Sequence, residues 1–262
     1  MSDLGRDAFT FIGPWDGRLV ATAVHNGHDL REEIAEEIAL EEDERFREED
    51  PFTDLIGSGV LSQVVVHRSR FEVDLNRTRD EAVYVDGDDA WGLDLWEHDH
   101  LSEEQIERSL KIYDAFYREL GLRLDAIAQD GPFVVFDVHS YNHRREGEDA
   151  DPDPETENPE VNVGTGSLDR DRFGGVVDAF IDAMSAQGLD ARENVKFKGR
   201  GLAQWIHRRY PGVACVLALE FKKTYMDEWS GMPSQSRIYA LREALTQTIE
   251  PTLAALKAID ER

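Results

Sequence analysis

Apolar and polar stretches alternate along the chain in a way that predicts strands and helices in turn. Apolar runs rich in β-branched residues occur at Arg18–Val24 and Val60–Arg68, and more continuous ones at Pro132–Val138 and Val213–Phe221. Continuous apolar runs of this length are typical of strands that are buried on both faces. The shorter segment Phe71–Leu75 also has the composition of a strand.

Between these runs, apolar residues recur at the spacing of amphipathic helices. The clearest case begins at Ser102, where Ser-Glu-Glu-Gln forms a capping box and an apolar stripe continues to Leu120. Similar patterns predict helices over Asp29–Phe46, Arg172–Gln187 and Ser236–Ile259. Strands that alternate with helices favour an α/β fold, with helices on both faces of a mixed, mostly parallel central sheet.

The segment Arg144–Pro159 interrupts this pattern. It reads RREGEDADPDPETENP and is dominated by Asp, Glu and Pro, a composition typical of a mobile surface loop. The apolar runs before and after it have the character of strands in one sheet. We therefore expect a single domain, residues 1–262, with an acidic loop insertion near residues 144–160.

The chain is strongly acidic. It contains 55 Asp and Glu against 29 Lys and Arg, which gives a formal net charge of −26. This charge would repel phosphates over most of the surface, so we expect no nucleic-acid partner. Most of the cations are arginines, and carboxylates with few lysines suit a surface that stays hydrated in concentrated salt. We therefore interpret the composition as an adaptation to high salt, with an ordinary acidic cytosolic protein as the alternative.

Three absences narrow the class further. No apolar run approaches the roughly 20 residues of a membrane-spanning helix, so we expect no membrane association. The first residues lack the basic and apolar regions of a signal peptide, which predicts a cytoplasmic protein. The lone Cys215 excludes an intramolecular disulfide framework and a cysteine-rich zinc site.

Candidate metal ligands follow two of the predicted strands. His25-Asn26-Gly27-His28 comes directly after the first strand, and His139 ends the run that contains Asp137. Sites in α/β proteins form at the carboxyl ends of strands, where Asp137 can also orient a histidine. Three imidazoles, His25, His28 and His139, would supply the ligands of a catalytic zinc site with one position left for water. The alternative is a polar turn with two solvent-exposed histidines.

Candidate catalytic and substrate-binding groups follow two other strands. Glu220 ends the run Val213–Phe221, where a carboxylate beside a metal-bound water is a natural general base. Its alternative is a surface ion pair with the adjacent lysines. Arg70, Asn76 and Arg77 can form a receptor for a substrate carboxylate, unless the arginines pair with neighbouring acids such as Asp74.

Taken in order, these motifs resemble the N-formylglutamate amidohydrolase family. The resemblance covers roughly Val20–Asp227 and lies within a wider group of zinc carboxypeptidase-like and aspartoacylase-like enzymes. Five motifs in the same order are more specific than any one of them. The motifs are the histidine–glycine turn after the first strand, SRFEVDLNR (Ser69–Arg77), FDVHS (Phe136–Ser140), NVKFKGRG (Asn194–Gly201) and LEFKKTYMDE (Leu219–Glu228).

The resemblance implies a zinc carboxypeptidase-like fold, one Zn²⁺ per chain and hydrolysis of a linear N-acyl amide, such as N-formylglutamate to formate and glutamate. It assigns His25 and His139 as ligands and Glu220 as the base. His28 stands where the wider group has a glutamate ligand, so Asp29, Glu33 or Asp50 are alternatives for the second ligand.

The resemblance also assigns the substrate's carboxylate to Asn76 and Arg77, with Arg70 as a third group. Lys198, Arg200 and Tyr225 are further candidates at the rim, and Tyr225 is included among the substrate-binding residues. A related zinc deacylase or carboxypeptidase with another N-acyl amino acid or an acidic peptide as substrate is the alternative activity. A non-catalytic anion- or metal-binding module of the same fold is the alternative outside enzymes. The expected partner is a small anionic substrate, and the oligomeric state stays open.

Overall fold

One mixed sheet organises the computed structural model, which describes residues 8–85, 90, 92–98 and 100–260. Within these residues the strand order is β1-β3-β2-β4-β7-β5-β6. The neighbours from β3 to β7 run parallel, as do β5 and β6, whereas the β1–β3 and β7–β5 pairs are antiparallel. The expected mixed, mostly parallel sheet is thereby confirmed. The strands are β1 (Phe9–Ile12), β2 (Leu19–Ala23), β3 (Gln63–Val66), β4 (Phe133–Tyr141), β5 (Val161–Gly164), β6 (Ala191–Glu193) and β7 (Ala214–Lys222).

The two longest strands, β4 and β7, lie at the centre and carry the most continuous apolar runs. Every residue of β4 is buried, because neighbouring strands cover its edges and helices cover its faces. β4 continues three residues beyond the run predicted from sequence, so His139 lies within the strand. Its register places His139 opposite Glu220 of β7.

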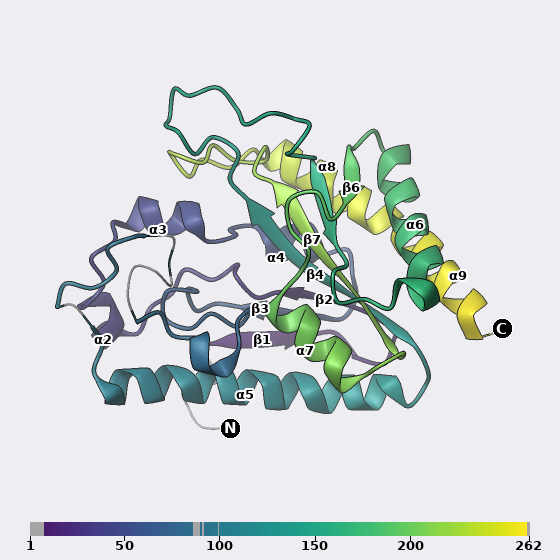
Figure 1. Ribbon diagram of the computed structural model, residues 1–262, viewed down its shortest axis with the longest axis horizontal. Coiled ribbons are helices and arrows are strands. Elements are labelled where there is room, and N and C mark those ends of the chain that lie inside the picture. The colour runs from purple at the N-terminus through teal and green to yellow at the C-terminus, as the bar shows by residue number, and fades with distance from the viewer. Residues whose placement is uncertain (1–7, 86–89, 91, 99, 261–262) are drawn as a thin grey trace.

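Helices cover both faces of the sheet, as expected (Figure 1). The long α5 and the shorter α7 lie against one face, where Phe116 and Ile206 join the same apolar cluster as Val135. α4, α6, α8 and α9 cover the other face, where Phe180 packs against Phe136. The helices are α2 (Glu32–Ala35), α3 (Glu42–Glu48), α4 (Thr53–Gly57), the 3₁₀ turn η1 (Arg79–Glu81), α5 (Glu103–Ala128), α6 (Arg170–Ala186), α7 (Gly201–Arg209), α8 (Gln235–Gln247) and α9 (Ile249–Asp260).

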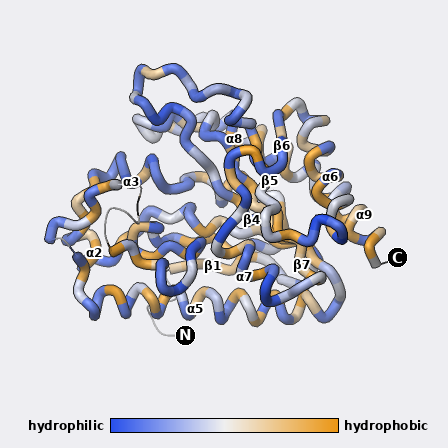
Figure 2. Tube along the Cα trace, in the orientation of Figure 1, coloured by the Kyte–Doolittle hydropathy of each residue, from blue (hydrophilic) through white to orange (hydrophobic). Residues whose placement is uncertain are grey.

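Hydropathy follows this layering (Figure 2). The central strands are apolar, whereas α3 and the long connection from β4 to β5 are hydrophilic. That connection contains the acidic segment singled out in the sequence, and it has no regular secondary structure between residues 142 and 160. The capping box at Ser102 is present at the start of α5. None of the described helices is both long and apolar enough to span a membrane.

Two predicted helices are each divided in the structure. The helix expected over Asp29–Phe46 becomes α2 and α3, because Ile38 between them forms an isolated bridge with Trp96 of a distant loop. The helix expected over Ser236–Ile259 ends at Gln247 and restarts as α9. Pro251 lies in the first turn of α9, where its missing N–H costs nothing, whereas it would break a continuous helix.

The strand expected at Phe71–Leu75 is also wrong. All five side chains are buried, but the backbone turns, with Glu72 N donating to Ser69 O at 3.0 Å. Side-chain burial was predicted correctly, whereas the backbone conformation was not. This buried turn carries Asp74, Asn76 and Arg77 toward the end of β4.

Candidate active site

His25 and His139 lie together at the carboxyl ends of two neighbouring strands. His25 follows β2 by two residues and His139 lies on β4, and their ring centroids are 4.9 Å apart. Both imidazoles are almost fully buried. The turn after His25 depends on Gly27, because a Cβ there would lie 2.2 Å from the carbonyl carbon of His67. The glycine therefore lets this turn dock closely beside the chain that follows β3.

Asp50 completes a cluster with these two histidines. Its Oδ2 lies 3.4 Å from His25 Nδ1 and 3.1 Å from His139 Nδ1. The three residues are buried, and they form the one group of potential metal ligands found among the described residues. The backbone N–H of Asp50 donates to His25 O at 2.9 Å, and Ser140 Oγ donates to Asp50 Oδ1 at 3.0 Å. One hydrogen bond thus holds the backbone of Asp50 and another holds its carboxylate.

Lys223 holds the segment that leads into Asp50. Its ammonium, on a side chain that is 1% exposed, donates to Arg47 O at 2.5 Å and to Glu49 O at 2.6 Å. These carbonyls belong to the end of α3, where the helix leaves carbonyls without partners in its own backbone. A cation at this position also complements the negative end of the helix. The buried lysine therefore anchors the residues directly before and after Glu48, and the second of these immediately precedes Asp50.

The second nitrogen of each histidine meets another carboxylate. His25 Nε2 lies 2.7 Å from Asp74 Oδ1, and His139 Nε2 lies 3.2 Å from Asp137 Oδ2. Outer carboxylates of this kind fix the ring orientation of metal-binding histidines. Asp137 was expected to orient a histidine, and the structure brings it beside His139.

Acidic groups dominate the electrostatics of the cluster. Burial alone would raise the pKa of Asp50, but hydrogen bonds and charges from His139 and His25 hold that pKa below its ordinary value. Burial lowers the pKa of His139, but Asp137 and Asp50 outweigh it and raise that pKa well above 6.5. Carboxylates that stabilise positive charge on an imidazole would stabilise a bound cation for the same reason.

The donor set fits a divalent metal ion. Two imidazole nitrogens and a carboxylate oxygen all lie within 4.8 Å of one another. Tetrahedral zinc has ligands at about 2.0–2.1 Å, which places neighbouring ligand atoms about 3.3 Å apart. The Nδ1–Oδ2 separations of 3.4 and 3.1 Å at His25 and His139 match that spacing. His25, Asp50 and His139 could therefore hold zinc and leave one coordination position open.

Glu220 lies beside this cluster. It is opposite His139 in the parallel β4–β7 register, so both side chains point to the same face of the sheet. Burial raises the pKa of Glu220 to about 8, His139 opposes this shift, and Asp50 and Asp137 add to it. Lys222 does not pair with Glu220, because its ammonium donates to Asn158 O at 2.8 Å. The surface ion pair considered from sequence is therefore not formed with either neighbouring lysine.

The structure does not bring His28 into the cluster. Its Nδ1 lies 2.5 Å from Glu49 Oε2, and its Nε2 lies 3.1 Å from Arg45 Nη2. Its side chain is 29% exposed, compared with 4% for His25. The position expected for His28 is occupied by Asp50, one of the carboxylates that the sequence left as an alternative. The other two alternatives, Asp29 and Glu33, are also outside the cluster.

Arg70, Asn76 and Arg77 lie around Asp74. Arg70 Nη2 donates to Asp74 Oδ2 at 2.8 Å, and Arg77 Nε is 3.7 Å from the same oxygen. Asn76 Nδ2 lies 3.4 Å from His139 Nε2, which connects this group to the candidate metal site. The pairing of the arginines with Asp74 that was considered from sequence is present. The carboxylate of Asp74 therefore offsets part of the positive charge of the two arginines.

Tyr225 is placed in the core instead of at the rim. Its side chain is 0% exposed, and its hydroxyl donates to Pro51 O at 3.1 Å. It therefore supports the loop immediately after Asp50. Direct contact between Tyr225 and a substrate has no support in this arrangement.

Sequence reasoning gave little weight to two residues that the structure places at the centre of the site. Asp50 was one of several alternatives, because it is one of seven acidic residues within the ten positions Glu41–Asp50. Its distinguishing signal is the following Pro51, which ends the acidic helix and places a single carboxylate at a fixed turn. Asp74 was considered only as an ion-pair partner of arginines. Its spacing of two residues before Asn76 was the available signal.

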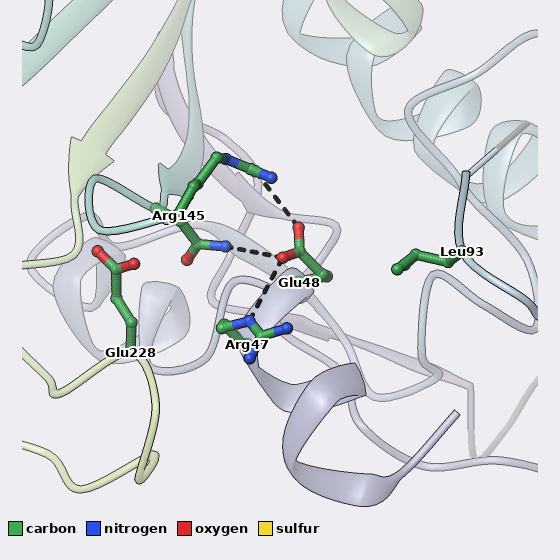
Figure 3. A pocket seen from close by; sticks show the side chains of 6 residues that line it. Arg47, Glu48, Leu93, Arg145 and Glu228 are labelled. Carbon is green, nitrogen blue, oxygen red and sulfur yellow. Dashed lines mark hydrogen bonds and ion pairs between the residues drawn. The ribbon is translucent and has the colours of Figure 1, made fainter. Parts of the chain in front are cut away.

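A small cavity of about 170 Å³ opens near the ends of α3 and β4 (Figure 3). None of the three cluster residues lines it. Its cations and its amide turn toward the carboxylate of Glu48, with Arg145 Nη2 at 3.3 Å and Asn142 Nδ2 at 3.1 Å. The lining residues are Arg47, Glu48, Leu93, Asn142, Arg145 and Glu228.

Comparison with known proteins identifies the family of the chain. The family model for N-formylglutamate amidohydrolase matches residues 17–226, a range that includes every residue of the cluster. The chain belongs to this family. No protein of curated function matches the chain in sequence.

Solved structures show the same fold. N-formylglutamate amidohydrolase from Ralstonia eutropha superposes with a TM-score of 0.78 at 17% identity, over 96% of this chain and 99% of that one. A gene product from Agrobacterium tumefaciens has a TM-score of 0.71 at 16% identity, over 99% of both chains. A metallo-carboxypeptidase from Burkholderia cenocepacia is a looser match, with a TM-score of 0.41 at 16% identity over 95% of this chain and 61% of that one. At this level of identity the first two likenesses show the shared fold.

Proposed function

We propose that this protein is a zinc-dependent amidohydrolase that cleaves the N-acyl bond of an amino acid. N-formylglutamate, hydrolysed to formate and glutamate, is the first candidate substrate. Membership of the N-formylglutamate amidohydrolase family supports the reaction class. The observation that carries the proposal is the convergence of His25, Asp50 and His139 beside Glu220, which lies opposite His139 in the sheet.

His25 Nδ1, His139 Nδ1 and one oxygen of Asp50 would hold the zinc. When bound, a zinc ion supplies a Lewis acid for the acyl carbonyl and a water whose pKa is lowered toward about 7. Asp74 and Asp137 would keep the two imidazole rings in the orientation that presents Nδ1 to the ion. Lys223 would keep Asp50 in place through the end of α3.

Glu220 is assigned as the general base and later the general acid. Its carboxylate would take a proton from the attacking water and return it to the departing amine. Its raised pKa, about 8, gives it affinity for that proton. A divalent cation beside it would favour the ionised form that begins the reaction.

Arg77 and Asn76, with Arg70 behind them, are assigned to a carboxylate of the substrate. The side chain of Arg77 is 28% exposed, whereas that of Arg70 is 13% exposed. Arg77 is therefore the more accessible of the two donors. With the amide of Asn76 beside it, Arg77 can donate to one carboxylate of the substrate.

The test is a hydrolysis panel with metal analysis of the purified chain. N-formyl, N-acetyl and N-succinyl derivatives of glutamate, aspartate and leucine are incubated with the zinc-loaded protein, in low and in molar salt. We expect about one zinc per chain and fastest release of formate from N-formylglutamate. Faster hydrolysis of another N-acyl group would replace the substrate and keep the reaction. Stoichiometric zinc with no hydrolysis of any compound would favour the non-catalytic binding module and overturn the proposal.

A further inference from the structure

An N-acyl derivative of glutamate or aspartate has two carboxylates, and the Asn76–Arg77 pair is assigned to one of them. Arg70 and Arg77 both lie beside Asp74, whose carboxylate offsets part of their positive charge. The whole chain has a formal charge of −26. A dicarboxylate substrate would therefore need a second local cation to offset repulsion from the surrounding field.

The segment from Lys198 to Leu202 contacts β7 near the general base at one end and Asn76 at the other. At one end, a Cβ on Gly199 would lie 3.1 Å from Cβ of Ala218, which is two residues before Glu220 and on the same face of β7. At the other end, a Cβ on Gly201 would lie 1.7 Å from Asn76 O.

Leu202 N also donates to Asn76 Oδ1 at 2.9 Å. Both glycines have positive φ, +78° at Gly199 and +36° at Gly201, a region that disfavours larger residues. Arg200 lies between them, directly before the first residue of α7 (Figure 1). Two close backbone contacts therefore hold Arg200 at the edge of the site.

Arg200 is an exposed cation with no acid assigned to it. Among the described residues, no carboxylate lies within ion-pair distance of its guanidinium, and its side chain caps no helix. Two other cations near the site are engaged: Arg79 pairs with Asp114 at 2.8 Å, and Lys223 donates to backbone carbonyls. Lys198, two residues before Arg200, is exposed in the same way.

The cations of the cavity in Figure 3 are matched in the same way. Arg47 and Arg145 both face Glu48, and Glu228 adds a second carboxylate to the lining. The described cavity has no net charge to offer an anion. Arg200 is therefore the better candidate for a second anionic group.

We propose that Arg200 binds the second carboxylate of the substrate and makes the enzyme selective for N-acyl derivatives of acidic amino acids. This inference rests on the proposed function. Arg77 and Asn76 bind one carboxylate, and the guanidinium of Arg200 binds the other with paired N–H donors. Arg200 is thus a specificity-determining residue, and the zinc ligands and the general base do not depend on it.

The experiment compares glutamate with glutamine, which has nearly the same shape but lacks the second charge. Values of kcat/KM are measured for N-formylglutamate and N-formylglutamine with the wild-type protein, Arg200→Gln and Arg200→Lys. We expect Arg200→Gln to lose about 10- to 100-fold on N-formylglutamate, the usual effect of a lost charged hydrogen bond, and less than about 3-fold on N-formylglutamine. The loss should be in KM, and Arg200→Lys should recover part of it.

Lys198→Gln is the matched control, because Lys198 is an exposed cation two residues away on the same segment. We expect it to leave the ratio of the two substrates unchanged. An equal effect of Lys198→Gln would mean that only the general field matters, and would overturn the proposal. Equal losses on both substrates in Arg200→Gln would indicate a structural role and would overturn it as well.

A binding measurement separates this inference from the proposed function. Calorimetric titration with L-glutamate and L-glutamine requires no turnover. A preference for glutamate that disappears in Arg200→Gln supports the inference even if no N-acyl compound is hydrolysed. Hydrolysis of N-formylglutamate with an unchanged preference for glutamate in Arg200→Gln supports the function and overturns the inference.

Discussion

His25 and His28 begin on the same turn and end in two different environments. His25 has Asp50 on one side of its ring and Asp74 on the other, at 3.4 and 2.7 Å, in a buried pocket between strand ends. His28 lies in a neighbouring polar network, with Glu49 at 2.5 Å and Arg45 at 3.1 Å. The first network contains converging metal donors. In the second, the imidazole of His28 is already paired with a carboxylate and a guanidinium.

The difference shows that strand position determines convergence more reliably than sequence spacing. His25 leaves β2 beside β4, so it meets His139 across adjacent parallel strands. Three residues later, His28 has turned toward α3, where Arg45 donates to its carbonyl at 2.9 Å. Asp50 reaches His25 from the far end of that helix. Consecutive carboxylates, Glu49 and Asp50, therefore serve the two networks separately.

The largest expected effect comes from removing the carboxylate of the candidate metal cluster, which tests whether the two histidine networks differ in metal binding. In Asp50→Asn we expect zinc affinity to fall more than the 10- to 100-fold typical of an outer partner, with loss of hydrolysis. Glu49→Gln is the matched control, because it changes the adjacent carboxylate in the His28 network and should keep the zinc. Metal content after dialysis and competition with a chelator measure the difference. Full zinc in Asp50→Asn would exclude Asp50 as a ligand.

The next largest effect separates chemistry from metal binding within the first network. In Glu220→Gln we expect zinc content to stay unchanged while kcat falls by about 10²- to 10⁴-fold, the usual contribution of a general base. Glu193→Gln is a suitable control, since Glu193 lies on β6 at the edge of the sheet. Single-turnover hydrolysis of N-formylglutamate gives the rate. Unimpaired turnover in Glu220→Gln would assign the proton transfer to another group.

Local sequence patterns were sufficient for the strands and helices whose burial is continuous. β2, β4, β7 and α6 lie within a few residues of their expected positions, because each has an uninterrupted apolar run or stripe. α5 begins at its predicted capping box and extends eight residues beyond the predicted stripe. The patterns failed where a distant contact overrides local propensity. Ile38 bridges Trp96, and this contact divides a predicted helix. No local periodicity contains that information.

The residues of the candidate site also fall into those that local sequence could predict and those that depend on distant contacts. His139 and Glu220 could be predicted, since each lies near the end of an apolar strand. Burying a polar group there costs free energy unless the group has a partner. Asp50 could not be separated from its acidic neighbours, because its contacts with His25 and His139 are 25 and 89 residues away along the chain. Tyr225 was predicted from its motif alone, and packing under Pro51 decides its environment instead.

A smaller effect tests how α3 connects the two networks. In Lys223→Met the carbonyls of Arg47 and Glu49 lose their ammonium donor, so the end of α3 should loosen and Asp50 should be less well placed. We expect zinc affinity to fall about 10-fold, as for other supporting partners of a ligand. Lys222→Met is the control, because that ammonium donates to Asn158 O in the acidic connection. Equal losses in both variants would remove the special role of Lys223.

The smallest effect concerns His28 and is one of stability. The hydrogen bond with Glu49 is the largest influence on the pKa of His28, burial opposes it, and the net result is a raised pKa. A group with a raised pKa in the folded state binds its proton more tightly there than in the unfolded chain. Its contribution is therefore full below about pH 6.5 and is lost as the pH rises through the folded-state pKa.

In His28→Gln we expect unchanged zinc content and a free energy of unfolding lower by about 1–2 kcal/mol at pH 6, because Glu49 loses a charged partner. The difference from the wild-type protein should shrink as the pH rises above 6.5, and urea denaturation of both proteins over this range measures the unfolding free energies. A difference that grows with pH would contradict the assigned Glu49–His28 interaction. Loss of zinc in His28→Gln would return His28 to the ligand set and merge the two networks that the structure separates.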